Sequence, residues 1–134
     1  CSKAQILTFL YRAKGSPSPR TTINPFSDVA KSDYYYNAAL WAYENGIVEG
    51  TVFSPDEPCT RAMCADYMWK ASGSPSTEYA HGFYDVASWD SYDRAVAWAV
   101  ENGVTTGTGN NNFSPAEICT RAQIVTFLYR LMNA

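Results

Sequence analysis

Residues 119–130 read Cys-Thr-Arg-Ala-Gln-Ile-Val-Thr-Phe-Leu-Tyr-Arg, and related versions of this stretch stand at 1–12 and 59–70. Three copies of one segment in a chain of 134 residues indicate stacked copies of a single supersecondary unit. We name these copies the capped segments. The rest of the chain connects them or packs against them, so they decide the fold.

Each capped segment has the pattern of an amphipathic helix with a start signal. A hydroxyl residue stands at the N-cap, and in two copies a glutamine three residues later completes a capping box. Apolar residues then recur at helical spacing. We predict helices over about 2–13, 60–71 and 120–132. The cap residues are Ser2, Thr60 and Thr120, and the box glutamines are Gln5 and Gln123. The equivalent core positions are Ile6, Cys64 and Ile124.

A second repeated block lies between the capped segments. It contains Phe-x-Asp-Val at 26–29 and 83–86, a tryptophan-bearing stretch that ends in Asn-Gly, and then Phe-Ser-Pro. Alanine and tryptophan at helical spacing predict a further helix in each block, over roughly 33–45 and 91–102. The short segments after Asn-Gly are predicted to be extended. The cap candidates for these helices are Ser32 or Asp33, and Asp90 or Ser91.

Composition limits the classes of function. Hydrophobic residues make up 46% of the chain, which is enough for a modest core, and no apolar run reaches membrane-spanning length. The net charge of −3 argues against nucleic acid or an anionic membrane as the main partner. The chain begins with Cys inside a repeat, so we expect it to be a piece of a longer protein.

The four cysteines are predicted to be unpaired thiols, most of them buried. Cys1, Cys59 and Cys119 are repeat-equivalent, and three equivalent sites cannot pair off among themselves. Cys64 replaces an isoleucine of the other copies and is interpreted as a core residue. With a single histidine, His81, and no Cys-x-x-Cys, we expect neither a metal site nor a cofactor.

Taken in order, the block motifs and the Thr-Arg-Ala of the capped segments resemble the S-layer homology domain. This resemblance implies an all-α fold, a pseudo-threefold bundle of helical repeats with short extended segments. It also implies binding of a secondary cell-wall polymer, an acidic and commonly pyruvylated glycan, at the surface of a bacterium. The motif matches assign ligand roles to Arg61, Arg121 and Lys3.

For these sites the sequence leaves a second interpretation open. The two arginines lie in the first helical turn, where a ligand carboxylate suits them, but an ion pair with Asp28 or Asp85 is the alternative. The two aspartates are repeat-equivalent, and we expect them to bind nearby backbone N–H groups instead of acting as an acid–base pair. Trp41 and Trp98 are predicted core residues. Trp89 and the tyrosines around Tyr35 are predicted to form an exposed aromatic edge for the ligand.

We expect one domain over 1–134, with repeats at 25–73 and 82–134 and the last helix of an incomplete repeat at 1–15. Its expected function is non-covalent anchoring to the wall, with a protein-interaction module on the same scaffold as the alternative. No catalytic residues stand out, so an enzyme is not expected. Because one block is missing before helix 2–13, we expect the apolar side chains Ile6, Phe9 and Leu10 to need a cover from another copy or from upstream sequence, which allows self-association.

Overall fold

The computed structural model describes residues 1–21 and 23–133. These residues form five helices and no sheet, with three isolated β-bridges. The expectation of an all-α chain is therefore confirmed. In chain order the helices are α1 (Lys3–Ala13), α2 (Tyr36–Glu44), α3 (Arg61–Ala71), α4 (Asp93–Glu101) and α5 (Arg121–Met132).

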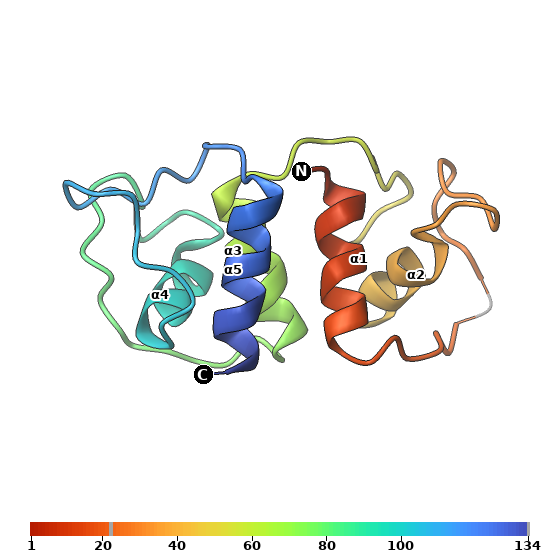
Figure 1. Ribbon diagram of the computed structural model, residues 1–134, viewed down its shortest axis with the longest axis horizontal. Coiled ribbons are helices and arrows are strands. Elements are labelled where there is room, and N and C mark those ends of the chain that lie inside the picture. Colours follow the sequence, from red (N-terminus) through yellow and green to blue (C-terminus); the bar gives the residue numbers. More distant parts are fainter. Residues whose placement is uncertain (22, 134) are drawn as a thin grey trace. The chain divides into compact units, whose positions relative to one another are not determined.

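The chain divides into two compact units, Cys1–Pro58 and Cys59–Ala134. In the first unit α1 packs against α2, and in the second α3 packs against α4 (Figure 1). The capped-segment helices α1 and α3 therefore each pack against the tryptophan-bearing helix that follows in the chain. None of the described helices is long and apolar enough to cross a membrane.

The predicted helix starts of the capped segments are confirmed. The hydroxyls of Ser2, Thr60 and Thr120 each accept the backbone N–H three residues later. Gln5 and Gln123 complete capping boxes, and the middle copy, which has Met63 there, does not. The three equivalent core positions are buried, since Ile6, Cys64 and Ile124 expose at most 1% of their surface. The three helices thus start at equivalent residues and bury equivalent positions.

The block helices are shorter than predicted, and their cap assignment was wrong. The residues at their N-cap positions are Tyr35 and Tyr92, and neither makes a side-chain cap bond. Asp33 and Asp90 instead accept the backbone N–H of the residue three earlier, which closes a turn before each helix. Because the two carboxylates bind backbone N–H groups of this turn, they do not cap the helices, which begin later in the chain. Both helices end at an Asn-Gly pair with the glycine at positive φ, as predicted.

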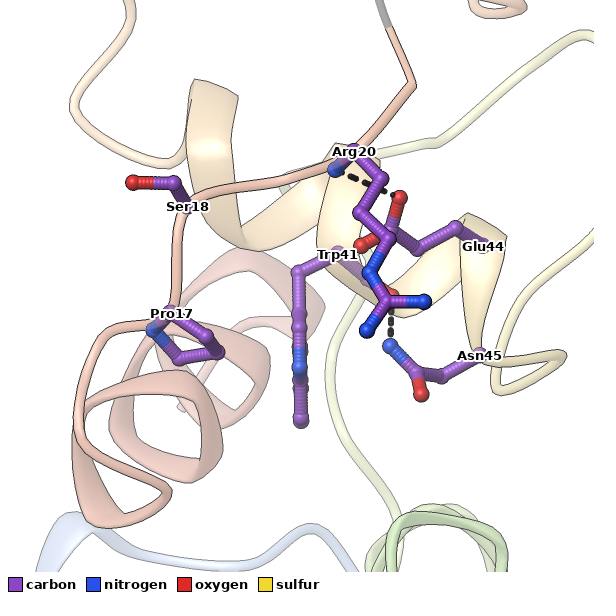
Figure 2. Close-up of a pocket in the computed structure, with 6 residues that line it drawn as sticks. All are labelled: Pro17, Ser18, Arg20, Trp41, Glu44 and Asn45. Atoms are coloured by element: carbon purple, nitrogen blue, oxygen red, sulfur yellow. Dashed lines mark hydrogen bonds between the residues drawn. The ribbon is translucent and has the colours of Figure 1, made fainter.

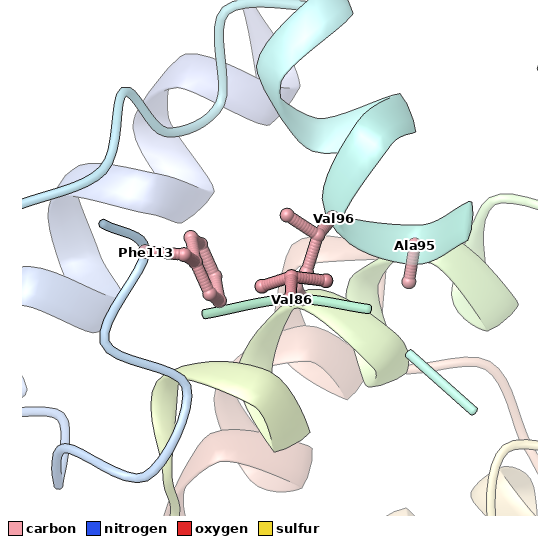
Figure 3. Close-up of a cluster of buried hydrophobic side chains, with 5 residues drawn as sticks. Val86, Ala95, Val96 and Phe113 are labelled. Atoms are coloured by element: carbon pink, nitrogen blue, oxygen red, sulfur yellow. The ribbon is translucent and has the colours of Figure 1, made fainter. Parts of the chain in front are cut away.

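The core of the second unit contains the cluster shown in Figure 3, where Val86, Val96 and Phe113 lie beside Ala95 of α4. Ala65 of α3 belongs to the same cluster. The predicted burial of the block tryptophans is confirmed, because Trp41 and Trp98 are each 6% exposed.

The expected bare surface on helix 2–13 is not found. Within a single chain Ile6 and Leu10 are fully buried and Phe9 is half-buried, and α2 packs on α1. The helix with an exposed apolar face is α5, where Val125 is 51% and Tyr129 69% exposed. The expectation failed because it paired each capped helix with the preceding block, whereas the structure pairs α1 and α3 with the block that follows.

Gly107 provides a test of local packing. Its φ is +88°, and a Cβ added there would lie 2.7 Å from a ring carbon of Phe83 and 2.8 Å from the carbonyl oxygen of Asn112. The repeat-equivalent Gly50 has a similar φ of +93° but open space around it. We expect Gly50→Ala to cost about 1–2 kcal/mol from backbone strain, and Gly107→Ala to cost about 1–3 kcal/mol more from overpacking. Urea unfolding of both variants measures the difference, and equal costs would contradict the packing of this turn.

Candidate ligand-binding groove

Arg61 is the buried cation of the second unit. It begins α3 and is only 4% exposed. Its Nε donates to the carbonyl oxygen of Phe113 at 2.7 Å, and one Nη donates to the hydroxyl of Thr105 at 3.2 Å. The guanidinium carbon lies 4.7 Å from the centre of the Phe113 ring and 5.5 Å from that of Phe127. Two hydrogen bonds and two aromatic faces hold this cation in one orientation.

The predicted alternative of an ion pair with an aspartate is not adopted by Arg61. Asp85 accepts the backbone N–H groups of Phe113 and Ser114, each at 2.8 Å. Asp28 accepts the corresponding groups of Phe53 and Ser54 in the first unit. The structural role predicted for both aspartates is confirmed. Burial opposes ionisation of Asp28, but these backbone donors outweigh it and hold its pKa below the usual value.

A groove of about 270 Å³ opens beside Arg61. Thr105 and Gly107, from the segment after α4, line one part, and Arg61 of α3 and residues of α5 line the rest. No carboxylate is among the lining residues, whereas a second arginine, Arg130, is. Among the described residues the Arg130 guanidinium has no partner, and Arg61 keeps further N–H donors. In order of sequence the lining residues are Arg61, Thr105, Thr106, Gly107, Ala122, Gln123, Thr126, Phe127 and Arg130.

The sequence did not assign Arg130 and Thr105 to a site. Arg130 lies in the last turn of α5, where a cation also suits the helix dipole. Thr105 stands where the first unit has Val48, and this repeat difference was the one available signal. A hydroxyl at a position that is apolar in the sister repeat indicates a polar partner, which the structure identifies as Arg61.

In the first unit Lys3 occupies the position equivalent to Arg61. Its Nζ lies 5.2 Å from the centre of the Phe53 ring, so a cation over an aromatic ring recurs. Burial lowers the pKa of Lys3, while Glu57 and Asp28 act in the opposite direction. The two units therefore hold related cations, but only the second has a guanidinium with a hydroxyl partner.

The other predicted ligand residues are spread over both units. Arg121 is exposed at the start of α5, outside the groove lining. Trp89 is 87% exposed, as expected for an aromatic edge. Tyr35 is half-buried, and its ring stacks on Phe53 at 5.7 Å, so it does not form the exposed edge that the sequence predicted. Burial and the neighbouring Asp33 raise the pKa of Tyr35 to about 12.

His81 lies outside this groove and forms a hydrogen bond with Asp93 through its Nε2 at 2.7 Å. Its Nδ1 accepts the backbone N–H of Phe83, so the proton lies on Nε2 and is donated to the carboxylate. Asn24 plays the same part in the first unit, where its side-chain oxygen accepts the N–H of Phe26. His81 is therefore a turn-closing residue.

The hydrogen bonds of Asp93 should make the free energy of unfolding depend on pH. Burial opposes its ionisation, but hydrogen bonds from His81 and Arg94 outweigh this and lower its pKa from the usual 3.8. The stability it contributes is therefore present above about pH 4 and is lost as pH falls through the lower folded pKa. We expect the stability difference between the wild type and Asp93→Asn to shrink between about pH 5 and about pH 3. Urea unfolding across this range measures it, and a constant difference would contradict the contact.

The four cysteines form no disulfide in the described part of the chain. Cys64 is 1% exposed, which confirms its core role. A hydrogen bond with the Cys119 thiol and burial raise the pKa of Cys64 well above its usual value. Within residues 1–21 and 23–133, no three His, Cys, Asp or Glu side chains gather as metal ligands.

Most of each repeat is similar to known proteins. Residues 25–62 and 82–125 match the family model of the S-layer homology domain. An endoglucanase of Bacillus sp. (strain KSM-635) is 32% identical over 79% of this chain, and an exoglucanase XynX of Acetivibrio thermocellus is 32% identical over 81%. An amylopullulanase of Thermoanaerobacterium thermosulfurigenes is 34% identical over 81%. The chain spans only 11%, 11% and 6% of these relatives, respectively.

Proposed function

Because the chain belongs to the S-layer homology domain family, we propose that it anchors a bacterial surface protein to the cell wall by binding an acidic secondary wall polymer. The observation that carries this proposal is the groove beside Arg61. Two arginines line it and no carboxylate does, although the chain as a whole has a net charge of −3. The overall field repels an anion, so a cationic groove in this chain is a local arrangement for one.

The chemistry of the groove favours a carboxylate on a sugar, such as a pyruvyl group. A guanidinium binds a carboxylate through paired N–H donors, and Arg61 is already oriented by Phe113 and Thr105. Arg130 is exposed and has no partner among the described residues, so it can close on the ligand from α5. Thr106 and Gln123 supply neutral hydrogen-bonding groups for the rest of the sugar.

Lys3, Arg121, Trp89 and Tyr35 remain proposed ligand residues outside this groove. Arg121 has the strongest support among them, because it is exposed at a helix start beside backbone donors. If it contacts the polymer, Arg121→Ala weakens binding about tenfold, since a charge-assisted contact contributes about 1.5–3 kcal/mol. Arg121→Lys should recover part of this loss because it keeps the charge but not the paired donors.

We further propose that residues 1–134 form one domain in which α1, α3 and α5 are related by rough threefold symmetry. Repeats at 25–73 and 82–134, with an incomplete repeat at 1–15, would supply them. The shared N-cap hydroxyls and the shared buried positions support this arrangement. A crystal structure in which the three helices are not related by such a rotation would contradict it.

The matched relatives carry the names of enzymes, but the similarity covers a small part of each, so we propose no catalytic role for this chain. The proposed location is the outer face of the cell wall.

A second function, protein binding or self-association, is favoured by one observation, the exposed apolar face of α5 at Val125, Tyr129 and Met132. Sedimentation over a range of concentrations tests self-association, and Val125→Asp should abolish it.

Calorimetric titration tests the acidic ligand. The whole chain is titrated with purified acidic wall polymer and with the same polymer after its carboxylate groups have been removed chemically. We expect binding to the first and a loss of at least about tenfold with the second. Equal affinity for the two polymers would show that the groove does not recognise the acid.

A further inference from the structure

A second hollow, of about 340 Å³, lies in the first unit at the end of α2. This is at the lower end of the range of about 300–1,000 Å³ for small-molecule sites. It is bounded by α2 and by the segment that follows α1, and it shares no residue with the groove beside Arg61 (Figure 2). The lining residues are Pro17, Ser18, Arg20, Trp41, Glu44 and Asn45.

The apolar part of the hollow is small and rigid. Trp41 is 6% exposed and its ring lies 5.7 Å from that of Tyr11, so the core fixes it in place. Figure 2 shows the indole edge-on, between Pro17 and Arg20. The lining therefore offers one fixed aromatic ring and one proline ring, an apolar wall that suits a compact ring more than a long acyl chain.

The polar part combines donors and acceptors with balanced charge. Glu44 accepts the backbone N–H groups of Arg20 at 2.9 Å and Thr21 at 3.0 Å, which fixes its carboxylate at the rim. The amide nitrogen of Asn45 donates to the carbonyl of Trp41, which leaves its side-chain oxygen as an acceptor. The Arg20 guanidinium has no partner among the described residues.

This chemistry differs from that of the Arg61 groove. One carboxylate accompanies the one guanidinium here, so an anion gains little from the site as a whole. Hydroxyl groups both donate and accept, and adjacent hydroxyls on a ring can bind a guanidinium and a carboxylate together. We propose that this hollow is a binding site for a neutral sugar ring, with Arg20 and Glu44 as its hydrogen-bonding pair and Pro17 and Trp41 as its apolar wall.

The second unit provides a natural comparison. Trp98, Glu101 and Asn102 repeat the residues from α2, but Thr77 stands in the place of Arg20. The Thr77 hydroxyl binds the Glu101 carboxylate at 3.1 Å, so that acceptor is already engaged and no guanidinium faces it from this position. Arg20→Thr therefore introduces into the first unit the residue that the second unit carries at this position.

The test is a titration of the ¹⁵N-labelled whole chain, followed by NMR. The probes are the β-1,4-linked tetramer of N-acetylglucosamine, cellotetraose, and a tetramer of galacturonic acid as the acidic comparison. We expect a neutral tetramer to shift the indole N–H of Trp41 and the side-chain amide of Asn45. Arg20→Thr should weaken this binding at least about tenfold. The matched variant Glu101→Gln, in the second unit, should leave it unchanged.

Three results would overturn the proposal. These are no shift at Trp41 and Asn45 with either neutral tetramer, equal shifts in Arg20→Thr, or tighter binding of the acidic tetramer at these two residues. The proposal stands apart from the wall-anchoring function. If Arg130→Ala no longer binds acidic polymer but still shows the neutral-sugar shifts, the result bears on the groove beside Arg61 and leaves the neutral-sugar site unaffected.

Discussion

Arg61→Ala is expected to lower the free energy of unfolding by about 3 kcal/mol. Truncation leaves the carbonyl of Phe113 and the hydroxyl of Thr105 without their donor in a buried site, and each such loss costs about 1–3 kcal/mol. It also removes the side chain that packs on the ring of Phe127. Arg61 is only 4% exposed, so both hydrogen bonds are lost in a buried site.

The chain offers two comparisons for this variant. Arg61→Lys should retain part of the lost stability, because Lys3 already lies over the equivalent ring in the first unit. Arg121→Ala changes the exposed equivalent residue and should cost less than Arg61→Ala, because an exposed side chain leaves no buried group without its donor. Urea unfolding followed by far-ultraviolet circular dichroism measures all three. Equal and small effects for Arg61→Ala and Arg121→Ala would contradict the buried hydrogen bonds.

Arg130→Ala is expected to weaken binding of acidic wall polymer about tenfold or more without unfolding the chain. Its side chain is exposed and lines the groove beside Arg61. A charge-assisted contact contributes about 1.5–3 kcal/mol, and each 1.4 kcal/mol or so is a factor of ten in affinity. The effect should diminish as salt rises, since an exposed cation is screened.

Arg12 is the matched control for this experiment. It holds the same place in the last turn of α1 and is likewise exposed, but it does not line the groove. Arg12→Ala should leave affinity within about twofold in the same titration. If Arg12→Ala and Arg130→Ala weaken binding equally, the two residues act through net charge alone. That result would contradict the groove as the binding site for the acidic polymer.

Local signals predicted the helices well. The N-cap hydroxyls and glutamines of the capped segments act within three residues, so their effect on a helix start can be deduced directly from the chain. The same reasoning failed for Asp33 and Asp90, because a carboxylate near a helix start can also close the preceding turn. Sequence spacing does not distinguish those two uses.

Pairing between helices and the arrangement of the site depended on contacts far apart in sequence. The repeat pattern did not reveal whether α1 packs on the block before or after it, so the exposed face was assigned to the wrong helix. Arg61 was identified from its motif, but its partners Thr105 and Phe113 lie more than forty residues away. Arg130 had a sufficient local explanation at its helix end, and only the groove indicates a second role.

The most direct test of the wall-anchoring function is a pull-down of the chain with purified cell-wall sacculi, before and after chemical removal of their secondary polymers. The proposed function predicts that the wild type sediments with intact sacculi and stays in solution with the stripped ones. It also predicts that Arg130→Ala is depleted from the intact sacculi while Arg12→Ala is not. Equal retention of the wild type on intact and stripped sacculi, or its absence from both, would contradict the function proposed here.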